Sequence, residues 1–298
     1  MDIFIKIIAL IIVLFLIKYG VKKIKKYRKI YSKNGLDGVY YYFINKNIKN
    51  TGLNNFIDKK RRDLVLQISK KTNQEIYSGP YKGVKLLNLF SSYNVDLVST
   101  SLGTYELEVQ KKIIDLSKNF NLKTFVDLGA GEGFHIVSLV KKKIFQRGLA
   151  YEIDEKSRET LSKNLKLNNL ENKIEIYNEA NFESLKKNIN VNDTKDLLFL
   201  IDIEGNEFNL LTKDFCEYFQ NSFFIIEDHN FNVVEADKKN NFYSLIKNYF
   251  NIEILNDTVK DPFNIDILNE YNDDEKYLMM SEGRPKKMQW LVLKPKNN

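Results

Sequence analysis

Cysteine is nearly absent from this 298-residue chain. The one cysteine, Cys216, rules out a framework of internal disulfides, which fits a reducing compartment. With 43% hydrophobic and 29% charged residues, most of the chain should bury a core. The length suits one large domain with additions or two small domains, and no internal repeat divides it.

The body of the chain lacks net positive charge. The whole sequence has a formal charge of +7, but residues 1–33 hold nine basic residues and one acidic residue, a net +8. The remaining residues therefore carry a net charge of −1. A strong polyanion-binding surface is not implied, and we expect no nucleic-acid partner.

The apolar N-terminal segment lacks the small-residue cleavage site that follows a secretory signal peptide. "IFIKIIALIIVLFLIKYGV" runs from Ile3 to Val21, and two more lysines follow. Its uncharged centre, residues 7–17, is short for a helix that needs roughly 20 apolar residues to span a bilayer, so a helix lying in the interface is an alternative. We expect an uncleaved single-pass anchor over residues 1–21, with the N-terminus outside. The basic cluster that follows, and the catalytic domain, would then be cytoplasmic.

From residue 103 onward, helical and strand-like segments alternate. The strand-like segments are rich in continuous apolar runs: KTFVDL, GLAYEID, KIEIYNEA, DLLFLIDI, SFFIIEDH, NIEIL and MQWLVLKP. Such runs, separated by helices, indicate a parallel sheet covered on both faces, hence a doubly wound α/β fold of seven strands. Ligands of this fold bind beyond the carboxyl ends of the strands. We predict this domain over 103–298, preceded by a mixed helical and hairpin region over 22–102.

The loop "VDLGAGEGF", residues 126–134, lacks two common phosphate-binding signatures. A dinucleotide fingerprint, G-x-G-x-x-G, would need a glycine where Phe134 stands, and the G-K-S/T of an NTPase loop is missing. Three glycines do alternate, at Gly129, Gly131 and Gly133. They allow a sharp turn and close approach of a ligand to the main chain, and the following helix offers free N–H groups to an anionic group.

The pattern D-x-G-x-G-x-G resembles the first motif of class I S-adenosylmethionine-dependent methyltransferases. In that family the loop wraps the amino-acid part of the cofactor, and the leading acid orients it. The resemblance implies a Rossmann-like methyltransferase sheet and a cofactor site that includes Asp127, Gly129, Ala130, Gly131 and Gly133.

Two further acids follow the next two strands. Glu152 ends the second strand, where a carboxylate can accept hydrogen bonds from both ribose hydroxyls. Asp154 is better placed to cap the following helix. After the third strand, Glu179 stands where this fold often places an acid or amide against the adenine amine.

A second group of polar residues ends the fourth and fifth strands. "LIDIEGNEFNLL", residues 200–211, contains Asp202 and Glu204, which as alternate residues of a strand would share a face. The fifth strand ends in "FFIIEDHN", which brings Glu227 and His229 alongside. Adjacent like charges cost stability unless they are paired or solvated, so we expect these strand ends to border the cleft near the transferred methyl group.

These stretches narrow the resemblance to FkbM-type methyltransferases. "LIDIEGNEFNLL" is similar to their hallmark K-I-D-V-E-G-x-E, "LGTYELEV" to their G-x-Y-E segment, and "IIEDH" to their E-x-H strand end. The likeness spans about residues 77–294 and is densest over 103–229. Leu200 stands where the family often has lysine or arginine, so no role for that cation is carried over. The membrane segment is not part of the shared domain.

The resemblance implies methylation of a hydroxyl, typically on a sugar or polyketide. His229 is a candidate base because an unperturbed histidine titrates near neutrality. Asp202 is the rival, as base or as orienting group, and Glu204 joins them as a catalytic candidate. Asp202, Glu204, Glu227 and His229 together could instead bind a divalent cation that activates the hydroxyl. The sequence leaves the metal question open.

Other candidates surround this site. Tyr105 and Glu106 are expected on the cofactor side, although Glu106 also suits a helix start. His135 either meets the cofactor carboxylate or begins a helix. Glu227 and Arg284 are candidates for contacting the substrate.

We therefore expect a membrane-anchored S-adenosylmethionine-dependent O-methyltransferase (EC 2.1.1.-). Tethering would raise the effective concentration of a membrane-bound acceptor, so we expect a glycan or a lipid-linked sugar precursor. Two alternatives are a nicotinamide-dependent oxidoreductase, which the glycine spacing disfavours, and a non-catalytic membrane-tethered scaffold that binds the cofactor.

Overall fold

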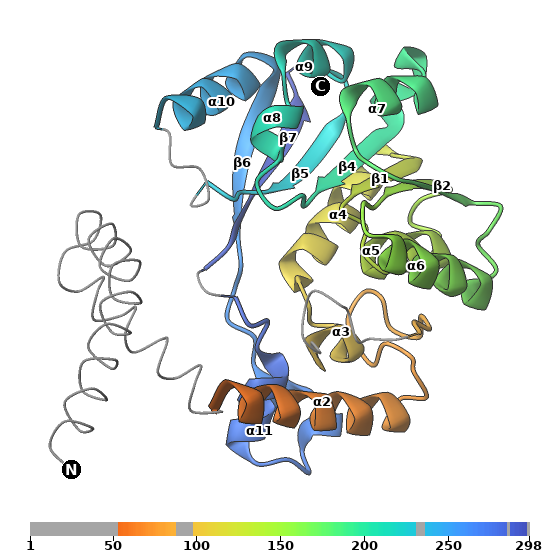
Figure 1. Ribbon diagram of the computed structural model, residues 1–298, viewed down its shortest axis with the longest axis vertical. Helices are drawn as coiled ribbons and strands as arrows, with labels where there is room; N and C mark the ends of the chain where they lie inside the picture. Colours follow the sequence, from red (N-terminus) through yellow and green to blue (C-terminus); the bar gives the residue numbers. More distant parts are fainter. Residues whose placement is uncertain (1–52, 88–97, 231–235, 285–286, 297–298) are drawn as a thin grey trace, which may run out of the picture. The chain divides into compact units, whose positions relative to one another are not determined.

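The computed structural model describes residues 53–87, 98–230, 236–284 and 287–296 (Figure 1). The chain divides into two compact units, residues 1–60 and 61–298, and the sheet and the candidate site lie in the second. The predicted anchor over residues 1–21 lies outside the described ranges. Within those ranges, no helix is both long and apolar enough to cross a bilayer. The predicted domain boundary at residue 103 stays a prediction.

Seven strands form one mixed sheet in the order β3-β2-β1-β4-β5-β7-β6. The strands are β1 (Thr124–Leu128), β2 (Arg147–Tyr151), β3 (Ile174–Tyr177), β4 (Leu197–Ile201), β5 (Phe223–Glu227), β6 (Phe250–Asn256) and β7 (Gln289–Pro295). This is a doubly wound, Rossmann-like α/β fold, and the predicted seven-stranded sheet is confirmed.

The strand directions correct one expectation. β1 to β5 run parallel, as predicted, with β1 between β2 and β4. β7 instead runs antiparallel between β5 and β6. The apolar run of β7, which is buried along most of its length, suits a central strand of either direction. An apolar run therefore reports burial but not direction.

Helices cover both faces of the sheet (Figure 1). Alternate residues of each strand point to opposite faces. In β1, Phe125 belongs to the core packed beneath α4, α5 and α6, whereas Val126 belongs to the core shared with α7 to α10. The bounds are α2 (Leu53–Lys71), α3 (Val98–Leu102), α4 (Leu107–Phe120), α5 (Phe134–Lys141), α6 (Glu155–Asn168), α7 (Phe182–Asn188), α8 (Glu207–Leu210), α9 (Lys213–Tyr218), α10 (Ala236–Tyr249) and α11 (Asp273–Met280), with 3₁₀ turns η1 (Val191–Asp196), η2 (Pro262–Asn264) and η3 (Asp266–Leu268).

Side-chain caps explain where several helices begin. Asp154 accepts a hydrogen bond from the Ser157 amide at 2.8 Å and caps α6, as the sequence predicts. Thr212 accepts a hydrogen bond from the amide of Phe215, so a new helix starts there. Two separate helices, α8 and α9, therefore stand between β4 and β5.

The region before the sheet contributes a small helical core and a cover. Residues of α2 from Leu64 onward pack with α3, η3 and α11 around Met279. The predicted hairpin around Gly79 is reduced to one antiparallel bridge between Glu75 and Lys85. Its buried residues, including Tyr81, join the core beneath α5. This segment therefore covers the α5 side of the sheet.

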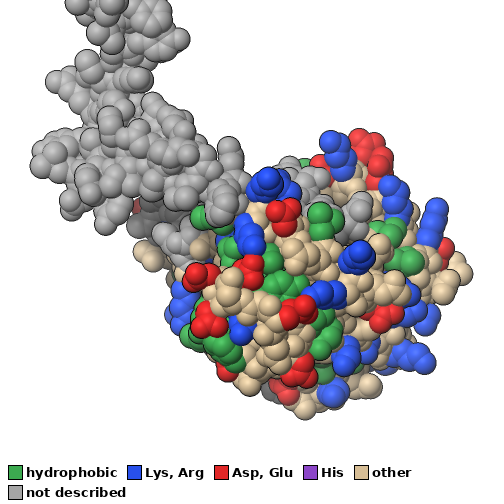
Figure 2. All heavy atoms as spheres, turned by 90° about the horizontal axis from the view of Figure 1, so that it is seen from below, with side chains coloured by type: hydrophobic (Ala, Val, Ile, Leu, Met, Phe, Trp, Pro, Cys, Tyr) green, Lys and Arg blue, Asp and Glu red, His purple; other side chains and the backbone are tan. Residues whose placement is uncertain are grey.

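Acidic and basic side chains are interspersed on the face shown in Figure 2. This distribution agrees with the near-neutral charge of the chain after residue 33. A mixed surface of this kind gives no long-range steering of a polyanion on the face shown.

Candidate active site

The glycine loop follows the carboxyl end of β1 and turns within contact of the chain that follows β4. A Cβ at Gly129 would stand 1.9 Å from the carbonyl oxygen of Asp202, and the residue has φ +89°. Only glycine combines this approach with this conformation. The Gly129 and Ala130 amides both donate to the Tyr151 carbonyl, at 2.9 and 3.0 Å. The loop is thus held between the ends of β2 and β4.

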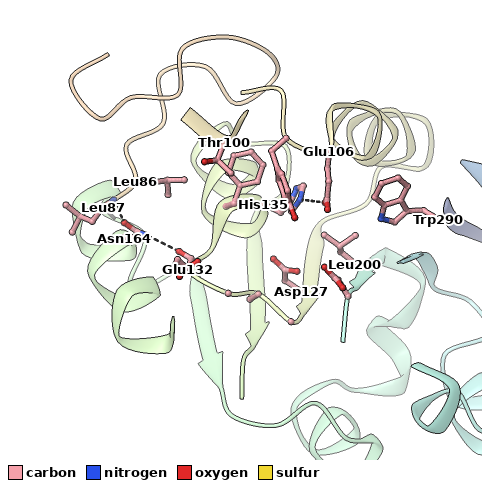
Figure 3. Close-up of a pocket in the computed structure, with 16 residues that line it drawn as sticks. Leu86, Leu87, Thr100, Glu106, Asp127, Glu132, His135, Asn164, Leu200 and Trp290 are labelled. Carbon is pink, nitrogen blue, oxygen red and sulfur yellow. Dashed lines mark hydrogen bonds and ion pairs between the residues drawn. The ribbon is translucent and has the colours of Figure 1, made fainter. Parts of the chain in front are cut away.

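Two cavities open on either side of this loop. One, of about 940 Å³, is lined by Tyr105, Asp127, His135 and Trp290 among others (Figure 3). The other, of about 1290 Å³, is lined by residues that follow β2, β3 and β4. Both volumes include space open to solvent. The two cavities share Gly129, Gly131, Glu132 and Asp202. They therefore form one cleft across the carboxyl ends of the strands, where ligands of this fold bind.

Asp127 is a buried acid at the edge of this cleft. It is 3% exposed although it lines the first cavity. Burial raises its pKa to about 7, against an ordinary value of 3.8, and the neighbouring charge of Glu106 adds to the effect. A cationic ligand group beside Asp127 would restore its ionised form. The ammonium of an amino acid has the required charge.

Glu152 and Glu179 line the second cavity, and the contact predicted between Glu152 and the cofactor ribose stays a prediction. The Glu152 carboxylate accepts hydrogen bonds from the amide of Gly131 at 2.8 Å and the amide of Asp154 at 2.7 Å. These bonds fix its position beside the loop. Glu179 is exposed, so its assignment to the adenine amine stays a prediction.

A buried polar chain borders the first cavity, and Figure 3 shows its contact between His135 and Glu106. The Nε2 atom of His135 lies 3.0 Å from Glu106, and its Nδ1 atom lies 3.0 Å from the hydroxyl of Tyr81. Burial alone would raise the pKa of Glu106, but the hydrogen bond from His135 and the charge of Arg284 outweigh it and hold the pKa at about 2. His135 thus lies in the first turn of α5 with both ring nitrogens engaged, and Glu106 is an ionised anchor at the start of α4.

Arg284 connects Glu106, at the first cavity, with the group of residues around His229. Its guanidinium pairs with Glu106 and Glu227 and donates to Glu282 at 2.8 Å. Its centre lies 5.1 Å from the ring of Trp290, in cation–π contact. The negative charges around it outweigh burial and raise its pKa further. The substrate contact predicted for Arg284 stays a prediction, and in this arrangement the side chain links three carboxylates.

The second group of predicted residues meets around His229. Its Nε2 atom lies 3.7 Å from Asp202 Oδ1, 3.8 Å from Glu204 Oε2 and 3.7 Å from Glu227 Oε2. Asp202 and Glu204 do not reach this place as alternate residues of a strand, because β4 ends at Ile201. Glu204 instead adopts a left-handed conformation, with φ 55°. The turn that follows β4, and not the alternation of side chains along a strand, therefore brings the carboxylates of Asp202 and Glu204 together.

Burial and neighbouring charge shift the pKa values of this group. Removal from bulk water raises the pKa of Asp202, and the charge of Glu227 adds to it. The pKa of Glu227 is raised by burial and by the charge of Glu106. Burial by itself lowers the pKa of His229, but its hydrogen bond to Glu207 and nearby carboxylates raise it overall. The group as a whole therefore favours bound protons or another positive charge.

Two functional candidates escaped sequence reasoning. Glu207 is 1% exposed and accepts hydrogen bonds from the amide of His229 at 3.1 Å and from the ring Nδ1 at 3.2 Å. Glu207 is the final acid of the E-G-x-E stretch over residues 204–207. Its position in that motif is the feature of the sequence that could have indicated a role in the site. Tyr81 gave no signal, because only the fold brings it to His135.

No family model matches this sequence, and no curated protein matches it. Among solved structures, the chain is similar to cofactor-bound Rv0187 from MTB, with 10% identity, a TM-score of 0.45, and coverage of 80% of this chain and 90% of that one. It is also similar to precorrin-6y C5,15-methyltransferase from Geobacter metallireducens GS-15, with 11% identity, a TM-score of 0.40, and coverage of 63% and 87%. A third is the M1A22 tRNA methyltransferase of B. subtilis, with 12% identity, a TM-score of 0.41, and coverage of 62% and 64%. Likeness at this level does not identify a substrate, so the function is argued from the cleft.

Proposed function

We propose that this protein is an S-adenosylmethionine-dependent O-methyltransferase of the FkbM type. The observation that carries the proposal is the cleft shared by the two cavities, which has Asp127 at one end and Glu152 at the other. Asp127 suits the ammonium of the cofactor's methionine part, and Glu152 suits the ribose diol. Asp202 lines both cavities, so the sulfonium between these two parts would lie near it.

The reaction needs a hydroxyl held in line with the sulfonium methyl group. An oxygen lone pair forms the new bond to the methyl carbon, and the carbon–sulfur bond breaks with its electron pair left on sulfur. The products are a methyl ether and S-adenosylhomocysteine, and the hydroxyl proton leaves to a base. Holding the reactants near 3 Å can supply roughly 7–11 kcal/mol of the barrier. Asp202 and His229 are the two candidates for directing that proton.

Binding of S-adenosylhomocysteine tests the cofactor half of the proposal. Calorimetric titration of the purified chain should show binding of this ligand and none of NADH. Glu152→Gln should weaken binding by about 10-fold or more, because one ribose hydroxyl would then face an amide N–H group instead of a carboxylate oxygen. Glu159→Gln is the matched control, since Glu159 is exposed on α6. Tight binding of NADH would favour the oxidoreductase alternative.

The acceptor is proposed from the sequence alone. The motifs typical of FkbM-type enzymes favour a sugar hydroxyl, and the apolar segment from Ile3 to Val21 favours a membrane-linked acceptor. We propose a single-pass orientation with the catalytic domain in the cytoplasm. Methyl transfer from labelled cofactor to a panel of lipid-linked and free glycans tests this. Efficient methylation of soluble small molecules alone would contradict it, and cofactor binding without transfer to any member would favour the scaffold alternative.

A further inference from the structure

We propose that Asp202, Glu227 and His229 form a binding site for one divalent cation beside the proposed cofactor cleft. One ligand atom from each residue lies within 4.8 Å of the other two. Two of the three, Glu227 and His229, are buried, with 4% of each residue exposed. The role of the ion in catalysis rests on the proposed function, but binding of the ion does not.

The distances fit a site that needs little adjustment. His229 Nε2 lies 3.7 Å from Asp202 Oδ1 and 3.7 Å from Glu227 Oε2. Two ligands that each lie about 2.1 Å from an ion, at a tetrahedral angle, stand about 3.4 Å apart. A shift of a few tenths of an ångström would bring each of these two pairs to that spacing, and the Asp202 and Glu227 oxygens lie within 4.8 Å of each other.

Glu207 prepares His229 for this task. A metal-binding histidine usually donates its other ring N–H to a carboxylate, which fixes the tautomer. Glu207 Oε1 lies 3.2 Å from Nδ1 of His229, and its other oxygen accepts a hydrogen bond from the amide of Gly205 at 2.9 Å. With the proton on Nδ1, the lone pair of Nε2 faces Asp202 and Glu227.

The charges around Asp202, Glu227 and His229 also favour a bound cation. Arg284 pairs with Oε1 of Glu227, while Oε2 of that residue faces His229. Asp202 Oδ1 is fully buried and has no hydrogen-bond partner among the described residues. A buried acceptor of this kind is costly unless a cation or a donor meets it. One divalent ion would satisfy both oxygens.

Such a site would favour an acceptor with two adjacent hydroxyl groups. Three protein ligands leave positions on the ion open, and oxygen donors suit them. Asp202 lines both cavities of the cleft, so an acceptor held by the ion would lie near the proposed position of the sulfonium. A vicinal diol could then bind the ion through both of its oxygens. If the proposed function holds, the methylated group is therefore one of two adjacent sugar hydroxyls.

Titration of the purified full chain with Mn²⁺, with free Mn²⁺ measured by its electron paramagnetic resonance signal, tests the site. We expect one ion per chain. Asp202→Asn and His229→Gln should each weaken binding at least 10-fold, and Glu207→Gln should weaken it about 10- to 100-fold through the histidine. Asp228→Asn is the matched control and should bind normally, since the Asp228 carboxylate accepts from the hydroxyl of Tyr243 at 2.8 and 2.7 Å.

The outcomes are separable from those of the cofactor test. Absence of Mn²⁺ binding, or equal binding by the wild type, Asp202→Asn and the control, would overturn the ion site. Circular dichroism melting of each variant shows whether the variant is folded. Only the variants that fold are then used to decide whether the ion site exists. Titrating S-adenosylhomocysteine into the same samples tests the cofactor cleft by itself. Cofactor binding without Mn²⁺ binding would contradict the ion site and leave the proposed methyltransferase function standing. Mn²⁺ binding without cofactor binding would contradict the proposed function and leave the ion site standing.

Discussion

Replacing Asp127 by asparagine should stabilise the ligand-free protein and weaken cofactor binding. The side chain is 3% exposed, and burial raises its pKa to about 7. A carboxyl group whose pKa is higher in the folded state than in the unfolded state favours folding only while it is protonated. Its ionisation therefore opposes folding at neutral pH.

The pKa values give the size of the effect. The pKa of Asp127 rises from 3.8 to about 7 on folding, a difference of about 3 units. At about 1.4 kcal/mol per unit, ionisation of Asp127 lowers the free energy of unfolding by about 4 kcal/mol at and above neutral pH. The contribution is absent below pH 3.8 and grows as the pH rises towards 7. Asparagine keeps the shape and removes this pH dependence.

Urea unfolding of the full chain, followed by circular dichroism from pH 5 to pH 8.5, measures the prediction. The difference in unfolding free energy between Asp127→Asn and the wild type should grow by about 2 kcal/mol over the lower part of this range and level off above pH 7. Asp193→Asn removes an exposed carboxylate and controls for the change in net charge. S-Adenosylhomocysteine should bind Asp127→Asn about 10- to 100-fold more weakly, because a hydrogen bond to a charged group is lost. Parallel stability curves for Asp127→Asn and the wild type would refute the reasoning.

Gly129→Ala should prevent the native loop from forming, because its Cβ would stand 1.9 Å from the Asp202 carbonyl oxygen, and urea unfolding should show a loss of several kcal/mol. Gly131→Ala meets no atom within 4 Å, so it should cost only about 1 kcal/mol of backbone strain, and equal losses for the two variants would contradict the close approach. Glu106→Gln should lower the free energy of unfolding by about 3–5 kcal/mol, because it removes the buried carboxylate that pairs with the half-buried Arg284. The same unfolding assay measures it, and a loss below 1 kcal/mol would show that Glu282 and Glu227 suffice.

The sequence predicted the parts of the site that lie at the carboxyl ends of the parallel strands. The D-x-G-x-G-x-G loop and the acid Glu152 at the next strand end sit at the cleft because parallel strands share one carboxyl edge. The meeting of Glu227 and His229 with Asp202 follows from the same rule applied to neighbouring strands. Predicting these contacts requires only the order of the strands in the sheet.

The parts that escaped prediction depend on contacts between distant segments. Arg284 reaches Glu106 across 178 positions of the chain, and Tyr81 reaches His135 across 54. No local pattern encodes such pairs. The direction of β7 escaped for a related reason, because an apolar run of its kind suits a central strand whether it is parallel or antiparallel.

The position of β7 in the sheet constrains the order in which the strands can pair during synthesis. The strand pairs with β5 on one side and β6 on the other, although both precede it in the sequence. β6 therefore has no place in the sheet until residues 289–295 have left the ribosome. Synthesis proceeds at about 5–20 residues per second, so a nascent chain spends seconds with the edge of β5 unpaired. That interval is when the nascent chain is most exposed to aggregation and when chaperones should bind it.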